Sequence, residues 1–176
     1  MEYRTNRRTG DKISVIGLGT SYIAETDEKE AIEALSYAYE HGINYADLAT
    51  ADAKTFSYYG KAFAAVRKDM RYQVHFGADY TGGKYGWTTD LETVKRSVEQ
   101  QLKELKTDYI DYGFVHCLDE EDDWSVCQKG GVLDYLWDFS RLRQRNAIIL
   151  SLALSHHRMP QGNVCTATTV SPVRQD

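Results

Sequence analysis

The sequence predicts an α/β fold built on a parallel sheet. From the first residues to about residue 157, apolar strand-like runs alternate with amphipathic helical stretches, which is the pattern of parallel α/β proteins. The composition agrees, because 42% of the 176 residues are hydrophobic and 27% are charged, as in ordinary folded domains. A chain of this length is expected to form a single domain.

The first predicted elements are a hairpin, a strand and a helix. A turn signal, Thr-Gly-Asp-Lys, lies at residues 9–12 and predicts the hairpin. The β-branched run at 13–16 closes on glycines and is expected to be the first strand of the main sheet. Asp27 then stands where it can cap a helix, which ends before Gly42.

The later elements continue the alternation. They are predicted in this order: a strand at 43–49, a helix at 56–68, a strand at 70–79, a helix at 91–105, a strand at 108–117, a helix at 132–145 and a strand at 147–155. The helix at 91–105 has the clearest period, and Thr89 with Glu92 forms a capping box at its start. Residues 158–176 have no period and are expected to be irregular.

Charge and cysteine content narrow the classes of function. The net charge of −5 lacks the basic footprint of a nucleic-acid binder, so small-molecule or protein partners are expected. The start of the chain has no signal-peptide core, and no apolar run is long enough to span a membrane, which predicts a cytoplasmic protein. Three widely spaced cysteines predict free thiols, and the acidic run at 119–123 predicts a solvated loop, so no metal site is expected.

Polar side chains stand at the carboxyl ends of three successive predicted strands. These side chains are Asp47, His75 and His116. In parallel α/β folds the loops at this end converge, and ligands bind there. A phenol from Tyr58 or Tyr59, at the next helix, can join them. Carboxylate, phenol and imidazole together are suited to proton transfer.

Each of these side chains also has a purely structural interpretation. A single histidine at a strand end is more often a hydrogen-bonded structural residue than a catalyst, and a single aspartate there often binds backbone amides. The recurrence at one end of three consecutive strands favours a functional site.

Several stretches resemble the aldo-keto reductases. These are "ISVIGLGT", "GINYADLATADAKTFSYYGKAF", "LKTDYIDYGFVH" and "IILSLALSHH", and the resemblance covers residues 3–157. It implies a (β/α)8 TIM-type barrel that reduces a small-molecule carbonyl with hydride from NADP(H) or NAD(H). The sequence also resembles the variant of the family that usually carries a C-terminal ferredoxin-like extension. The cluster-binding cysteines of that extension are absent from this chain.

The resemblance also implies roles for individual residues. Asp47 matches the catalytic aspartate, Tyr59 the proton-donating tyrosine, and His116 the histidine that orients the carbonyl oxygen. His75 stands where the family has a lysine, and Tyr58 is a rival to Tyr59 because the loop after Asp47 is longer than usual. The positions that match the family's cofactor contacts are Gly19, Thr20, Ser21, Asp47, Ser155 and His156.

The family pattern stops near residue 157, after five strands of the eight that a barrel needs. We therefore expect residues 1–157 to form the N-terminal portion of a barrel, and 158–176 to be a tail produced by truncation or a shifted reading frame. The alternative hypothesis is a non-catalytic fragment that self-associates through its open barrel edges.

Overall fold

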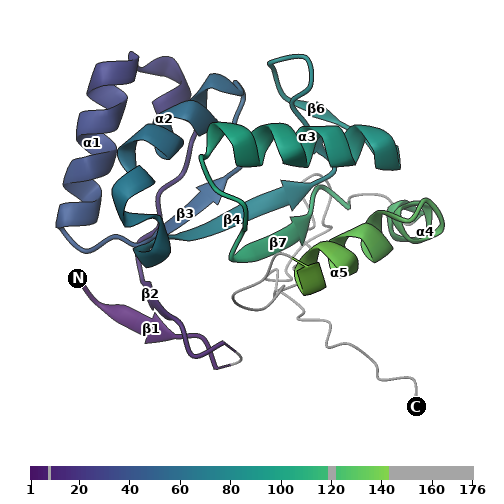
Figure 1. Cartoon of the computed structure of the whole chain (residues 1–176), viewed down its shortest axis with the longest axis horizontal. Coiled ribbons are helices and arrows are strands. Elements are labelled where there is room, and N and C mark those ends of the chain that lie inside the picture. Colours follow the sequence, from purple (N-terminus) through teal and green to yellow (C-terminus); the bar gives the residue numbers. More distant parts are fainter. Residues whose placement is uncertain (8, 119–121, 143–176) are drawn as a thin grey trace, which may run out of the picture.

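A three-stranded parallel sheet lies at the centre of the computed structural model, which describes residues 1–7, 9–118 and 122–142 (Figure 1). Its strands are β3 (Tyr45–Leu48), β4 (Arg71–Phe76) and β7 (Tyr112–Val115), in the order β3-β4-β7. The predicted parallel sheet is therefore confirmed, and over the described residues it is open rather than closed into a barrel. The strand predicted at 147–155 and the tail at 158–176 lie outside the described residues.

The helices follow one another along the sheet. They are α1 (Glu28–Glu40), α2 (Lys54–Ala62), α3 (Leu91–Glu104), α4 (Asp123–Lys129) and α5 (Val132–Leu142), with short 3₁₀ turns η1 (Ile23–Glu25) and η2 (Ala64–Asp69). Helix α1 packs on α2, α2 on α3, and α3 on α5, so the layer follows chain order (Figure 1). No helix within the described residues is long and apolar enough to cross a membrane.

The N-terminal strands differ from the prediction. Strands β1 (Tyr3–Thr5) and β2 (Lys12–Ser14) form an antiparallel hairpin apart from the main sheet. Residues 15 and 16, expected to continue the strand, are instead exposed. The chain joins the main sheet only at Leu18, which forms a parallel bridge with Ala46. The run at 13–16 was therefore wrongly assigned to the main sheet, because Ile13 and Ser14 pair with β1 instead.

Three other boundaries also differ from the prediction. The strand predicted at 70–79 breaks at Gly77, whose φ is +100°, and a short hairpin of β5 (Ala78–Asp79) and β6 (Gly86–Trp87) follows. The capping box of α3 was misplaced by one residue, because the Asp90 carboxylate accepts from the Thr93 amide at 2.9 Å. The end of the acidic run begins α4, and Asp27 caps α1 as predicted.

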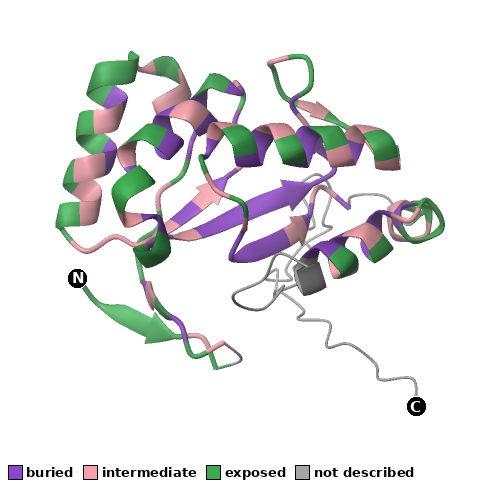
Figure 2. Ribbon diagram, in the orientation of Figure 1, coloured by how far each residue is buried: buried purple, intermediate pink, exposed green. Residues whose placement is uncertain are grey.

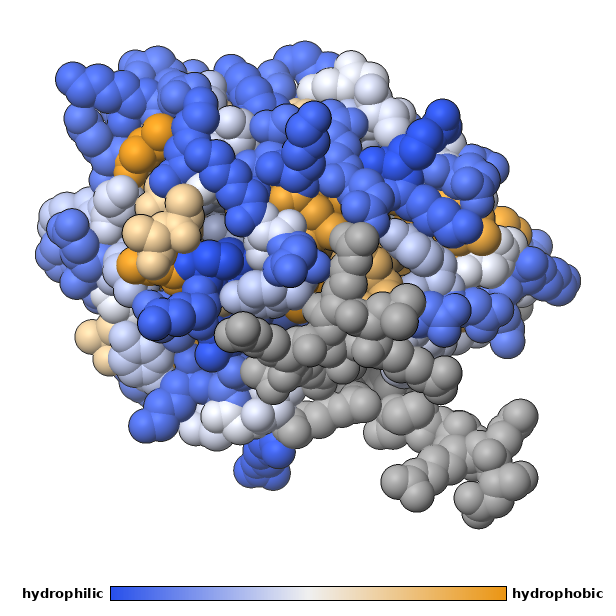
Figure 3. All heavy atoms as spheres, viewed as in Figure 1, coloured by the Kyte–Doolittle hydropathy of each residue, from blue (hydrophilic) through white to orange (hydrophobic). Residues whose placement is uncertain are grey.

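The core lies between the sheet and the helices, and β4 is buried almost throughout (Figure 2). It is rich in rings that are at most 1% exposed: Phe56, Tyr59, Phe63, Tyr72, Phe76 and Tyr80. The surface seen in Figure 3 is mainly hydrophilic, with small separate apolar areas. Many apolar side chains therefore pack between the helix layer and the sheet.

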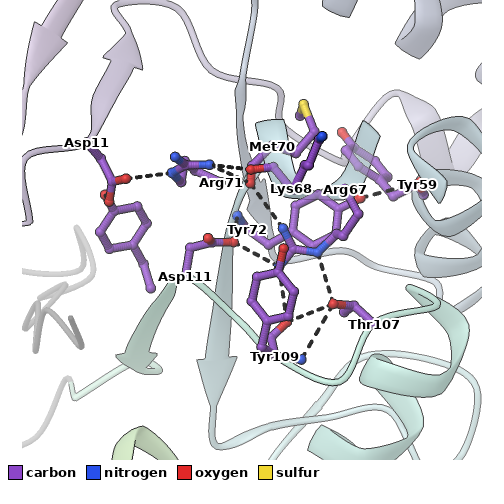
Figure 4. Close-up of polar contacts among 11 residues, drawn as sticks. Asp11, Tyr59, Arg67, Lys68, Met70, Arg71, Tyr72, Thr107, Tyr109 and Asp111 are labelled. Carbon is purple, nitrogen blue, oxygen red and sulfur yellow. Dashed lines mark hydrogen bonds and ion pairs between the residues drawn. The ribbon is translucent and has the colours of Figure 1, made fainter. Parts of the chain in front are cut away.

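A buried arginine joins the segment before β4 to the segment before β7 (Figure 4). The Arg67 guanidinium donates to Thr107 Oγ1, to the carbonyls of Met70 and Tyr109, and to the Asp111 carboxylate, at 3.0, 3.0, 3.0 and 2.8 Å. Four acceptors thus satisfy a cation whose side chain is only 9% exposed. This satisfaction is what makes burial of the charge tolerable.

Two tyrosine rings enclose the same guanidinium. Its central carbon lies 4.0 Å from the ring centroid of Tyr72 and 4.1 Å from that of Tyr109, which is cation–π geometry. Burial raises the pKa of Asp111 above its ordinary value, although the neighbouring Arg67 and the Tyr72 amide act in the opposite direction. The carboxylate therefore depends on Arg67 to stay charged in the core.

A second ion pair fastens the hairpin to the sheet. Arg71 Nε donates to Asp11 Oδ1 at 2.9 Å (Figure 4), and the Tyr112 hydroxyl donates to Asp11 Oδ2 at the same distance. Burial tends to raise the pKa of Asp11, but hydrogen bonds involving Thr9, Arg71 and Tyr112 outweigh it and hold the pKa below 3.8. Asp11 thus links the loop of the hairpin to β4 and β7.

Replacing the buried arginine should destabilise the fold strongly. We expect Arg67→Met to lower the free energy of unfolding by about 3–5 kcal/mol, because Asp111 is left buried without its partner. Urea unfolding followed by circular dichroism measures this loss. Lys68→Met, an exposed neighbour, is the matched control and should change stability by less than about 0.5 kcal/mol. Equal stabilities of the two variants would contradict this account.

Removing the Asp11 carboxylate should change the acid limb of stability. A carboxyl whose pKa is lower in the folded than in the unfolded chain contributes stability above its unfolded pKa, and loses it as pH falls through the folded pKa. Asp11→Asn should therefore be less stable at neutral pH and lose less stability below about pH 4. Urea unfolding across a pH series tests this, with the exposed Asp108→Asn as control. Parallel pH profiles for Asp11→Asn and the unmodified chain would be the contrary result.

Candidate active site

The register of the sheet gathers polar side chains at the carboxyl ends of its strands. Asp47 of β3 pairs with Gln73 of β4, and His75 lies two residues further along the same face of β4. His116 directly follows β7, and its backbone amide donates to the Phe76 carbonyl at 2.8 Å. The structure thus brings Asp47, His75 and His116 together.

Together with Tyr85, these three side chains form one continuous hydrogen-bonded chain. Asp47 Oδ1 lies 2.7 Å from His75 Nε2, and His75 Nδ1 lies 3.1 Å from His116 Nδ1. The other ring nitrogen of His116, Nε2, lies 3.0 Å from the hydroxyl of Tyr85. We call Asp47, His75, His116 and Tyr85 the proton chain. It runs from a carboxylate through two imidazoles to a phenol.

An amide fixes the carboxylate end of the proton chain. Gln73 Nε2 donates to Asp47 Oδ1 at 3.0 Å, and the Tyr45 hydroxyl donates to the amide oxygen of Gln73. Because the oxygen of the amide is held by Tyr45, its NH₂ group faces Asp47. Burial, and then the nearby Asp47 charge, raise the pKa of Tyr45 well above its ordinary value, so this phenol remains a donor.

The structure places Tyr59 beside this chain but not in it. The Tyr59 side chain is fully buried on α2, and its hydroxyl donates to the Gly19 carbonyl at 2.9 Å. Burial raises its pKa well above the ordinary value, with smaller contributions from Tyr72 and Asp47. Its rival Tyr58 is also buried, at 7% exposure. The phenol predicted to act as the acid is therefore part of the core.

The predicted cofactor contacts lie in the loop that follows the Leu18 bridge. Gly19 and Ser21 are exposed, and the Thr20 hydroxyl donates to the Ala49 carbonyl. Half of the Asp47 side chain, 47%, is exposed at the adjacent strand end. Ser155 and His156 lie outside the described residues. No group of three His, Cys, Asp or Glu side chains within the described ranges is arranged to hold a metal ion.

Three residues of this region escaped sequence reasoning. Gln73 could have been found, because it stands two residues before His75 and so shares its face of the strand. Tyr45 is related to Asp47 in the same way. Tyr85 carries no such signal, because it precedes the two-residue strand β6, which is too short to show a period.

Comparison with known proteins agrees with this fold. The family model described as "Aldo/keto reductase family" matches residues 15–159. From Bacillus subtilis, "Uncharacterized oxidoreductase YqkF" is 34% identical over 59% of this chain and 35% of its own length, and "Aldo-keto reductase YhdN" is 32% identical over 66% and 38%. A solved "Putative aldo-keto reductase" from Pseudomonas aeruginosa has a TM-score of 0.68 and 25% identity, covering 86% of this chain and 59% of that one. These similarities confirm the predicted partial (β/α)8 barrel.

A glycine sets the position of the helix that carries Tyr59. A Cβ added at Gly60 would lie 2.1 Å from the Glu104 carbonyl oxygen, so α2 would have to move away from α3. We expect Gly60→Ala to lower the free energy of unfolding by about 1–3 kcal/mol. Thermal unfolding measures this, with Gly82→Ala as control because a Cβ there meets no atom within 4 Å. A Gly60→Ala variant as stable as the control would show that the helices adjust without strain.

Proposed function

The chain belongs to the aldo/keto reductase family, and we propose that it serves in the reduction of a small-molecule carbonyl with NADP(H) or NAD(H). The observation that carries this proposal is the proton chain at the carboxyl ends of the parallel strands, where ligands bind in such folds. The chain spans 35% and 38% of the length of the two Bacillus subtilis relatives. The activity of a whole protein of that length is therefore also part of what we propose.

The residues present fit a polar part of such a cofactor. The space around Gly19 is open, since a Cβ there would meet no atom within 4 Å, and the exposed hydroxyl of Ser21 lies in the same loop. On the strand that the Leu18 bridge joins, the half-exposed Asp47 carboxylate can accept hydrogen bonds. Gly19, Thr20, Ser21 and Asp47 would hold the cofactor, which when bound supplies the hydride.

The protein's own contribution to such a reaction is a proton and its placement. Reduction places negative charge on the carbonyl oxygen, and a positioned acid that neutralises it accelerates the step by about 10²–10⁴-fold. His116 and His75 can carry that proton, and Asp47 stabilises it as a counter-charge. The assignment of the donor to Tyr59 stays a prediction, and it requires the Tyr59 hydroxyl to leave the Gly19 carbonyl.

Removing the counter-charge should impair the reaction while the fold persists. We expect Asp47→Asn to lower kcat by about 10²-fold or more, because an amide cannot stabilise the proton on His75. The purified chain is titrated with NADPH and with NADH by nicotinamide fluorescence. The loss of cofactor absorbance is then followed with a panel of aldehydes, ketones and aldoses.

Asp52→Asn is the control for this prediction. Asp52 follows Asp47 by five residues in the sequence but pairs with Lys84, at 2.6 Å, outside the proton chain. Its variant should keep the rate. Tight cofactor binding without reduction of any carbonyl by the unmodified chain would instead support a non-catalytic role, and the absence of binding at millimolar cofactor would count against both.

A further inference from the structure

Within the part of the chain that the structure describes, the Tyr85 hydroxyl contacts a histidine of the site, and it also lies 4.0 Å from the Cys117 thiol. It lies 3.0 Å from His116 Nε2, and the two rings meet edge to face at 5.5 Å between centroids. Trp87, two residues further on, donates its indole N–H to the His116 carbonyl at 3.1 Å. The hairpin of β5 and β6 therefore holds His116 at both its ring and its backbone.

The acceptor at one end of the proton chain dictates the direction of every bond in it. His75 Nε2 lies 2.7 Å from Asp47 Oδ1 and 3.1 Å from the Gln73 amide nitrogen, which itself donates to Asp47. An ionised carboxylate only accepts, so at the shorter contact His75 Nε2 carries a hydrogen toward Asp47. In neutral His75 the other nitrogen, Nδ1, is then an acceptor, and His116 must donate to it from its own Nδ1. His116 Nε2 is left as an acceptor, and Tyr85 donates to it.

One added proton reverses the bond between His75 and His116 and the bond between His116 and Tyr85. With His75 doubly protonated against Asp47, its Nδ1 donates to His116 Nδ1, and neutral His116 then carries its hydrogen on Nε2. This hydrogen is donated to the oxygen of Tyr85. The hydroxyl hydrogen of Tyr85 then no longer bonds His116, and Tyr85 can donate it to a bound molecule. With the added proton, the proton chain is therefore an acid, and the group at its end away from Asp47 is the phenol of Tyr85.

Exposure distinguishes Tyr85 from the phenol that the family resemblance indicates. Tyr85 is 45% exposed, whereas Tyr59 is fully buried with its hydroxyl bonded to Gly19. The Tyr85 ring therefore lies at the surface of the molecule rather than in its core. Tyr85 also keeps a bonded route to the carboxylate, which Tyr59 does not have in the described residues.

We propose that Tyr85 is the catalytic acid of this site and gives its proton to the carbonyl oxygen through the His116–His75–Asp47 relay. The inference rests on the proposed carbonyl reduction. As the carbonyl carbon accepts hydride from the reduced nicotinamide, the Tyr85 O–H bond breaks and its proton binds the carbonyl oxygen. Tyr85 takes the Nε2 proton of His116, and His116 Nδ1 takes the Nδ1 proton of His75. The product is an alcohol. Both imidazoles are then neutral beside the ionised Asp47, and the relay regains one proton from water.

The kinetic test compares two phenols. We expect Tyr85→Phe to lower kcat by about 10²–10⁴-fold with little change in KM or in cofactor binding. Tyr37→Phe, an exposed tyrosine of α1, is the matched control and should keep the rate. A large loss of kcat with Tyr59→Phe, while Tyr85→Phe retains the rate, would overturn the proposal and restore Tyr59 as the donor.

A spectroscopic test is independent of activity. Nitrogen-15 NMR of the histidine rings reports which ring nitrogen is protonated. We expect His116 to carry its proton on Nδ1 in the neutral relay and on Nε2 after the relay gains one proton, and Tyr85→Phe to alter the His116 Nε2 resonance. A His116 ring that keeps one tautomer as the relay titrates would refute the relay.

The two tests separate the two proposals. An unmodified chain that reduces no carbonyl, yet shows the tautomer exchange of His116, would refute the proposed reduction and with it the catalytic role of Tyr85, while the relay stands. Normal reduction by the Tyr85→Phe variant would refute only the role of Tyr85.

Discussion

The buried guanidinium of Arg67 is the interaction on which the rest of the molecule depends. It connects the chain before β4 to the chain before β7 through four hydrogen bonds and two aromatic faces. Parallel strands have no tight turn between them to fix their register, so a separate device has to do so. Because Arg67 aligns the two strands at their beginnings, His75 and His116 arrive side by side at their ends.

The two ends of the sheet are built for different purposes. Where the strands begin, the charges of Arg67, Arg71, Asp11 and Asp111 pair with one another and are satisfied by hydrogen bonds. Where they end, a half-exposed carboxylate and two imidazoles form a row whose bonds can reverse direction. This division between a stabilising end and a chemical end is characteristic of parallel (β/α) folds. The same sheet thus carries paired charges where its strands begin and hydrogen-bonded titratable side chains where they end.

Much of this could be predicted from periodicity, and the failures have specific physical causes. Alternating apolar and helical patterns located β3, β4 and β7, and strand ends identified Asp47, His75 and His116, because ends of parallel strands share one edge. The hydrophobic pattern of residues 13–16 could not show that they pair with β1. The helical face that carries Tyr59 could be predicted, but a phenol suits both a buried core and an active site. The burial of Tyr59 depends on the close packing of the neighbouring Gly60 on α3, which the sequence does not show. Tyr85 depends on a contact between segments 31 residues apart, which no local pattern encodes.

The division of the proton chain between strands and a hairpin has an evolutionary consequence. Asp47 and His75 lie within strands and His116 immediately follows one, so each is constrained by the core beneath it. Tyr85 instead belongs to a surface excursion between β4 and α3, where insertions, deletions and side-chain changes are readily accepted. Selection can therefore exchange, move or discard this phenol while the underlying imidazole row is inherited unchanged. A change in this one loop therefore alters the phenol end of the proton chain and leaves the strands beneath it as they are.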